Sequence, residues 1–101
     1  MRKILIALVA VVGFSSDLSA CYRAEIAGLP PYDDFLAVRT GPSTRYRQID
    51  SLYNGDIVFV CNRRGRWKKV FYSRRVGSCF LRGGYPVGDC YSGWVYGRYV
   101  Y

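Results

Sequence analysis

The feature that most limits what this chain can fold into is the regular interruption of short β-prone runs by glycine, proline and asparagine. No window sustains the spacing of apolar side chains that an amphipathic helix requires. Runs rich in β-branched and aromatic residues and bounded by turn residues are typical of strands. They predict strands at residues 23–26, 36–39, 49–52, 57–61, 67–72, 93–96 and 98–101. Short strands at this spacing favour an all-β domain, either a small barrel or a sandwich.

Two turn signals and one long gap separate the predicted strands. Asn54-Gly55 predicts a tight hairpin turn, since both residue types tolerate positive φ. A second turn is expected at residues 63–65. Residues 73–89 contain four glycines and a proline, and this composition predicts a loop.

Alternation along the strands assigns some side chains to the core. Leu36 and Val38 are two residues apart, so they share one face, which is predicted to point inward, while Arg39 points outward. Trp94 is expected in the core, because burying a tryptophan removes about 150–250 Å² from water. For Trp67 the pattern leaves a core position and a surface position equally open.

The N-terminal segment predicts export. Arg2 and Lys3 precede an apolar run over residues 4–14, which ends at polar residues 15–17. This run has the length of a signal-peptide core and is shorter than the roughly 20 residues that a membrane-spanning helix needs. We therefore expect a signal peptide at residues 1–20, an exported protein in the periplasm or cell envelope, and one mature domain at residues 21–101.

The cysteines leave two readings of the cleavage site open. Leu18-Ser19-Ala20-Cys21 resembles the lipobox of bacterial lipoproteins, which would place a lipid on Cys21 as the sole membrane contact. Against lipidation, the set of four cysteines suits two disulfides in an oxidising compartment: Cys21, Cys61, Cys79 and Cys90. Cys79 and Cys90 are close in sequence within the predicted loop, so we expect at least one disulfide to involve that loop.

The composition argues against an enzyme. The chain has no histidine, which excludes Ser-His and Cys-His nucleophile pairs and histidine metal ligands. It has seven carboxylates, and its cysteine spacing fits no zinc framework. We expect no catalytic residue, no metal and no cofactor.

A series of short motifs resembles the bacterial SH3-like (SH3b) domain. The opening signature is Leu36-x-Val38-Arg39-x-Gly41-Pro42-Ser43-x-x-Tyr46, followed by Asn54-Gly55-Asp56, Gly65-x-Trp67-x-x-Val70 and Gly93-Trp94-Val95. The resemblance covers about residues 34–101. It implies a small SH3-like barrel. The insertion at residues 73–89 departs from the family, which usually has a short turn there, and predicts an extended, cysteine-bracketed loop before the last strands. The resemblance also implies a non-catalytic module that binds peptidoglycan or another anionic cell-wall component.

The charge is consistent with that function. Seven cations fall between Arg63 and Arg75, and the mature chain would carry a net charge of +7. Such a cluster is predicted to attract anionic envelope polymers. The candidate ligand-binding residues are Arg39, Tyr46, Arg63, Arg64, Arg66, Trp67 and Tyr99.

Two other functions compete with wall binding. The loop between Cys79 and Cys90 could serve a protein-interaction factor, such as an inhibitor or an assembly subunit. Basic residues interleaved with aromatic ones also suit nucleic acid, but export counts against that partner. The expected partner is a cell-wall polymer or an envelope protein, and not nucleic acid.

We predict that intact-mass analysis of protein from its host shows the loss of residues 1–20. A diacylglycerol on Cys21 would identify a lipoprotein, and an unmodified Cys21 a soluble exported protein. A mass that retains Met1 would contradict export.

Overall fold

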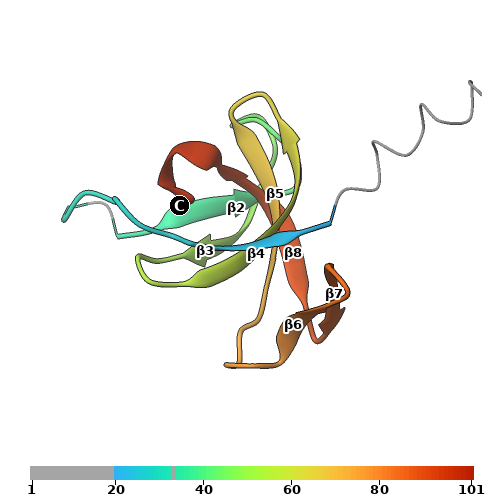
Figure 1. The fold of residues 1–101 in the computed structure, drawn as a ribbon. Helices are drawn as coiled ribbons and strands as arrows, with labels where there is room; N and C mark the ends of the chain where they lie inside the picture. The colour runs from blue at the N-terminus through green and yellow to red at the C-terminus, as the bar shows by residue number, and fades with distance from the viewer. Residues whose placement is uncertain (1–19, 33) are drawn as a thin grey trace, which may run out of the picture.

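The computed structural model describes residues 20–32 and 34–101, in which nearly all regular structure is β (Figure 1). The predicted signal peptide, apart from Ala20, lies outside the described residues. The strands are β1 Tyr22–Glu25, β2 Leu36–Arg39, β3 Gln48–Leu52, β4 Ile57–Arg64, β5 Trp67–Tyr72, β6 Cys79–Arg82, β7 Tyr85–Gly88 and β8 Tyr91–Tyr96. A short 3₁₀ helix, η2, covers Gly97–Tyr99. No helix among the described residues has the length and hydrophobicity needed to cross a bilayer.

Six strands form one antiparallel sheet in the order β1-β4-β5-β8-β2-β3, and β6 and β7 form a separate hairpin. The all-β, SH3-like prediction is confirmed, and β2 has the predicted bounds. The sheet is not closed into a barrel, because its edge strands β1 and β3 do not pair with each other. Tyr101 instead covers the free edge of β1, where its backbone N–H and carbonyl each bond to Glu25 at 2.9 Å.

The predicted hairpin at Asn54-Gly55 is wrong, since β3 and β4 lie apart in the sheet. A β-turn does form there, closed by the Asp56 N–H bonding to the Tyr53 carbonyl at 3.0 Å. Gly55 alone has positive φ, as in a type II turn. The Asn54 amide holds this turn against Leu29 by accepting from its N–H at 3.1 Å and donating to its carbonyl at 3.3 Å. These bonds draw the turn toward the segment after β1, so β4 pairs with β1.

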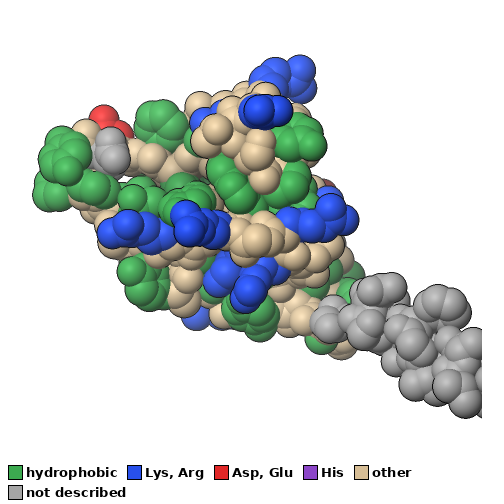
Figure 2. Space-filling model, turned by 90° about the horizontal axis from the view of Figure 1, so that it is seen from above, with side chains coloured by type: hydrophobic (Ala, Val, Ile, Leu, Met, Phe, Trp, Pro, Cys, Tyr) green, Lys and Arg blue, Asp and Glu red, His purple; other side chains and the backbone are tan. Residues whose placement is uncertain are grey.

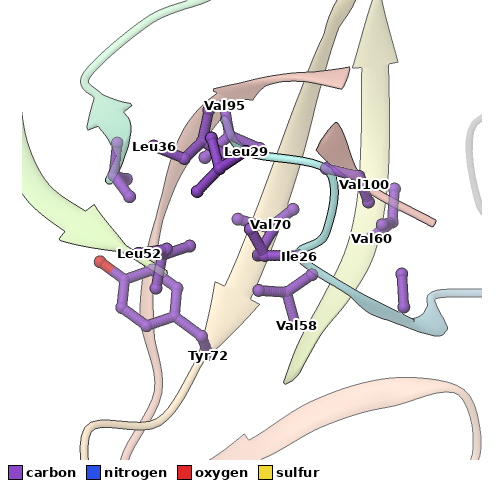
Figure 3. Close-up of a cluster of buried hydrophobic side chains, with 12 residues drawn as sticks. Ile26, Leu29, Leu36, Leu52, Val58, Val60, Val70, Tyr72, Val95 and Val100 are labelled. Carbon is purple, nitrogen blue, oxygen red and sulfur yellow. The ribbon is translucent and has the colours of Figure 1, made fainter. Parts of the chain in front are cut away.

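The core is built from aliphatic side chains and the ring of Tyr72, which point toward one another between the strands (Figure 3). Alternation along the strands supplies it as predicted, with Leu36 and Val38 inward and Arg39 at the surface. Val58, Val70 and Ile26 are fully buried with Val38.

Two strands approach each other closely where β2 crosses β8. Arg39 is the one residue of β2 that pairs with β8, opposite Trp94. A Cβ added at neighbouring Gly93 would lie 2.4 Å from Val38 Cγ1 and 3.0 Å from the Arg39 carbonyl oxygen. Only glycine allows this approach, because any other side chain would collide with a fully buried valine.

Both disulfides that the cysteine count allows are present. Cys21–Cys61 joins the start of β1 to an irregularity in β4, where the register with β5 shifts between Val60 and Asn62. Cys79–Cys90 links the start of β6 to the residue before β8, which confirms the expected disulfide in the loop.

Two predicted elements differ in the structure. Residues 73–89, predicted as a loop, contain the β6–β7 hairpin, because Gly83 and Gly84 form a turn with positive φ between paired strands. Residues 98–101, predicted as a strand, begin inside η2 instead. The Gly97 N–H bonds to the Arg66 carbonyl at 2.7 Å, and the chain then bends toward β1, where Val100 forms a single bridge with Ile26.

We predict that Gly93→Ala lowers the free energy of unfolding by about 1–3 kcal/mol, because the added methyl overpacks a rigid crossing. Denaturant unfolding measures the change, with Ser92→Ala on the same strand as the matched control. The double variant with Val38→Ala should lose less stability than the sum of the two single variants. If the losses of unfolding free energy in the two single variants simply add in the double variant, the close contact between positions 93 and 38 is contradicted.

Candidate binding surface

Strand pairing sets cationic and aromatic side chains side by side on the outward face of the sheet. Lys69 of β5 stands opposite Trp94 of β8, which stands opposite Arg39 of β2. One step toward the β4–β5 turn, Arg64 pairs with Trp67, and Trp67 pairs with Tyr96. This face therefore carries cations next to aromatic rings.

The predicted core position of Trp94 is wrong. Its neighbours Gly93 and Val95 point inward and are buried, so alternation turns the Trp94 ring to the outward face, where it is half-buried. On the buried side of the β2–β8 crossing, Val38 occupies the space next to Gly93, so a tryptophan ring does not fit there.

Trp67 and Tyr96 form an aromatic wall near the β4–β5 turn. Their rings meet edge to face with centroids 5.7 Å apart, and the Tyr99 ring continues the series at 6.3 Å from Tyr96. Tyr96 and Tyr99 also pack against the core. The wall is thus anchored from below, and Trp67, whose position the sequence left open, is its half-buried outer member.

A cleft of about 500 Å³ runs along this wall. Its lining residues are Leu36, Ala37, Arg39, Ser43, Thr44, Arg66, Trp67 and Tyr96. The loop after β2 forms one side of the cleft and is held by Arg39, whose Nη1 donates to the carbonyl oxygens of Tyr46 at 3.0 Å and Thr44 at 3.5 Å. The cleft therefore offers aromatic rings, hydroxyls and guanidinium groups to one ligand.

The structure brings together only some of the predicted ligand-binding residues. Arg39, Arg66 and Trp67 line the cleft. Arg64 lies beside Trp67 on the same face, whereas Arg63 pairs with Lys68 one position out of phase. The remaining two predicted residues, Tyr46 and Tyr99, do not line the cleft: Tyr46 packs its ring over Gly41, and Tyr99 packs against the core.

Five lining residues were absent from the predicted set: Leu36, Ala37, Ser43, Thr44 and Tyr96. Tyr96 follows Val95 on the face of β8 opposite to the buried Gly93 and Val95, and the expectation that Trp94 was inward hid this position. Ser43 and Thr44 carried no comparable signal, because a loop's direction depends on the contacts that hold it.

The seven cations between Arg63 and Arg75 do not form one patch. Alternation along β4 and β5 divides those nearest the turn between the two faces of the sheet. Arg74 and Arg75 lie at the other end of β5, toward the β6–β7 hairpin. Figure 2, which views the molecule from above, shows Lys and Arg spread among hydrophobic side chains, with acidic groups mainly at one margin.

Arg74 belongs to a separate polar cluster centred on Asp50. One Asp50 carboxylate oxygen accepts from the Tyr72 hydroxyl at 2.6 Å and from Arg74 Nη2 at 2.7 Å. The Arg74 guanidinium also lies 4.6 Å from the Tyr91 ring centroid. Burial, strengthened by the hydrogen bond to Asp50, raises the pKa of Tyr72 above the ordinary tyrosine value.

The cluster borders a second cleft of about 580 Å³ between the β3–β4 turn and the segment before β6. Asp50, Tyr53 and Arg74 are among its lining residues, together with the fully exposed Val76. Within the described ranges, no group of three or more histidine, cysteine, aspartate or glutamate residues is placed to hold a metal ion.

We predict that Tyr72 stays protonated in the native protein at pH values above about 10, where an unperturbed tyrosine side chain ionises. Because its native pKa is raised, its contribution to stability is complete below about pH 10 and is lost as the pH rises through the native value. Tyrosine-ring NMR during an alkaline titration measures this, and Tyr72→Phe should remove the late-titrating signal. Ionisation of Tyr72 near pH 10 in the folded protein would contradict the assignment.

Comparison with known proteins gives one match. The family model described as bacterial SH3 domain matches residues 34–101, which is more than half of the chain and includes the whole cleft. The searches of curated proteins and of solved structures gave no significant match.

Proposed function

The chain belongs to the bacterial SH3 domain family, and we propose that it is a non-catalytic binding module of the bacterial envelope. Its ligand is peptidoglycan or another anionic cell-wall component. The observation that carries this proposal is the cleft where Trp67 and Tyr96 stand beside Arg66 and Arg39. An aromatic face packs against the apolar face of a sugar or peptide, and a guanidinium binds carboxylate or phosphate oxygens.

Two kinds of contact contribute to ligand binding in this cleft, aromatic packing and attraction between charges. The aromatic wall is anchored on the core, so it can bind a ligand with little loss of side-chain freedom. Arg66 is exposed at the β4–β5 turn and attracts anions over a distance that salt shortens. Binding should therefore combine a salt-insensitive aromatic part with a salt-sensitive charged part.

The cysteines support export of a soluble protein. Disulfides persist in oxidising compartments, and all four cysteines of the chain are paired. The Cys21 sulfur is the atom that lipidation would modify, and here it is bonded to Cys61. We therefore favour cleavage after Ala20 followed by disulfide formation, without a lipid on Cys21.

A protein-interaction role remains the second candidate, favoured by the β6–β7 hairpin. The hairpin is fixed by Cys79–Cys90 and lies at the end of the molecule away from the β4–β5 turn (Figure 1). Phe80 on this hairpin and Val76 before it are large exposed apolar side chains. Such side chains on a rigid hairpin suit contact with another protein.

We predict that Trp67→Ala weakens binding to purified cell wall about tenfold at every salt concentration, through loss of the aromatic contact. Arg66→Ser should weaken binding several-fold at about 0.1 M salt and by less than about twofold at 1 M, because salt screens exposed charges. Co-sedimentation with purified wall measures both effects. Arg75→Ser, with the same change in charge at the opposite end of β5, is the matched control.

Circular dichroism and thermal unfolding must show that each variant is folded, since Trp67 is half-buried. Unchanged wall binding by folded Trp67→Ala and Arg66→Ser would refute this function. If substitutions at Val76 and Phe80 instead abolish capture of an envelope protein, the interaction role replaces it.

A further inference from the structure

A small hollow with a strongly cationic lining lies between the β4–β5 turn and η2. Its volume is about 220 Å³, less than half that of the cleft at Trp67. Its lining residues are Arg63, Gly65, Arg66, Lys68, Tyr96, Gly97 and Arg98. Four of these seven described residues are cations, and none is acidic.

The positions of these cations are set by the backbone. Arg63 and Lys68 are direct partners across β4 and β5. The Lys68 stem lies over Gly97, since a Cβ added there would be 3.3 Å from Lys68 Cγ and Cε. Gly97 is in turn bonded to the Arg66 carbonyl, which fixes η2 against the turn. Arg98, within η2, is carried to the same hollow.

No counter-charge offsets this cluster within the parts of the chain that the structure describes. The ion pair recorded there joins Arg74 to Asp50, at the other end of β5. Like charges directly opposite each other on paired strands destabilise a sheet. A bound anion would relieve this repulsion, so the arrangement is typical of a binding site.

The geometry favours a phosphate group over a carboxylate. One arginine fork satisfies the two oxygens of a carboxylate, whereas three guanidinium groups and an ammonium offer donors for all the oxygens of a tetrahedral anion. The hollow is lined by cations and by the ring of Tyr96, so it offers charge rather than an apolar surface for a sugar ring. The large exposed hydrophobic side chains lie elsewhere, which argues against docking on a membrane.

The hollow and the cleft share Arg66 and Tyr96 as lining residues. The two sites therefore adjoin at these residues. A ligand that spans them would place a sugar or polyol unit on Trp67 and its adjacent charged group in the hollow.

We propose that this hollow binds the phosphate of a phosphate-bearing envelope polymer whose neighbouring unit lies in the Trp67 cleft. The inference rests on the proposed wall-binding function and narrows its ligand from anionic components in general to phosphate-linked polymers. Arg63, Lys68 and Arg98 are assigned to the phosphate, with Arg66 between the two sites.

The test uses purified exported protein and a poly(glycerol phosphate) chain as the probe. The double variant Arg63→Gln/Arg98→Gln should bind this probe at least tenfold more weakly than the parent in calorimetry or NMR titration. The control Arg75→Gln/Arg82→Gln removes the same charge away from the hollow and should change binding by less than twofold. A polymer carrying carboxylates at similar spacing should bind the parent at least tenfold more weakly than the phosphate polymer.

Equal binding of the probe by the folded Arg63/Arg98 variant and the parent would overturn the proposal. Equal affinity for the carboxylate polymer would overturn the choice of phosphate. Tighter, Arg63-dependent binding to phosphatidylglycerol vesicles than to the polymer would overturn it in favour of a membrane surface.

The outcomes also separate this inference from the function on which it rests. If wall binding needs Trp67 but is unaffected by the Arg63/Arg98 substitutions, the hollow is not part of the wall site. The phosphate inference then fails, and the wall-binding function stands. If the phosphate polymer binds through Arg63 and Arg98 while purified wall does not bind, the wall-binding function fails and the phosphate site stands.

Discussion

The close crossing of β2 over β8 at Gly93 is the contact on which the arrangement of this domain depends. Val38 occupies the space that a side chain at Gly93 would need, and Arg39 forms the one pair between the two strands. This crossing brings the loop after β2 next to β5 and β8. The cleft exists because that loop then faces Trp67 and Tyr96.

The two ends of the molecule differ in how their charges are balanced. At one end Asp50 accepts from Tyr72 and Arg74, so a carboxylate offsets the local cation. Around the β4–β5 turn, four cations share a hollow whose described lining contains no acid. Stability explains the first arrangement, because a buried hydroxyl needs a partner. The second has no structural benefit of this kind, which is why we assign it to ligand binding.

Much of the fold could be predicted from the sequence because it depends on local rules. The period of two in residues 36–39 placed Val38 inside, and the spacing of Cys79 and Cys90 indicated a bridge within one loop. The hairpin predicted at Asn54-Gly55 failed because a turn signal does not say which strands pair. Asn54 bonds to Leu29, 25 residues earlier in the chain, and no local pattern contains that contact.

The sequence by itself determined the all-β class, the inward face of β2, the family and the presence of cations and aromatic rings near residues 63–75. Only the tertiary structure decided which of these cationic and aromatic side chains lie close together. Alternation across β4 and β5 separated Arg63 from Arg64, and the β2 crossing turned Trp94 outward. The bend at Gly97 brought Arg98 to Lys68. Composition fixes which groups a chain carries, but strand pairing and close packing fix the distances on which binding depends.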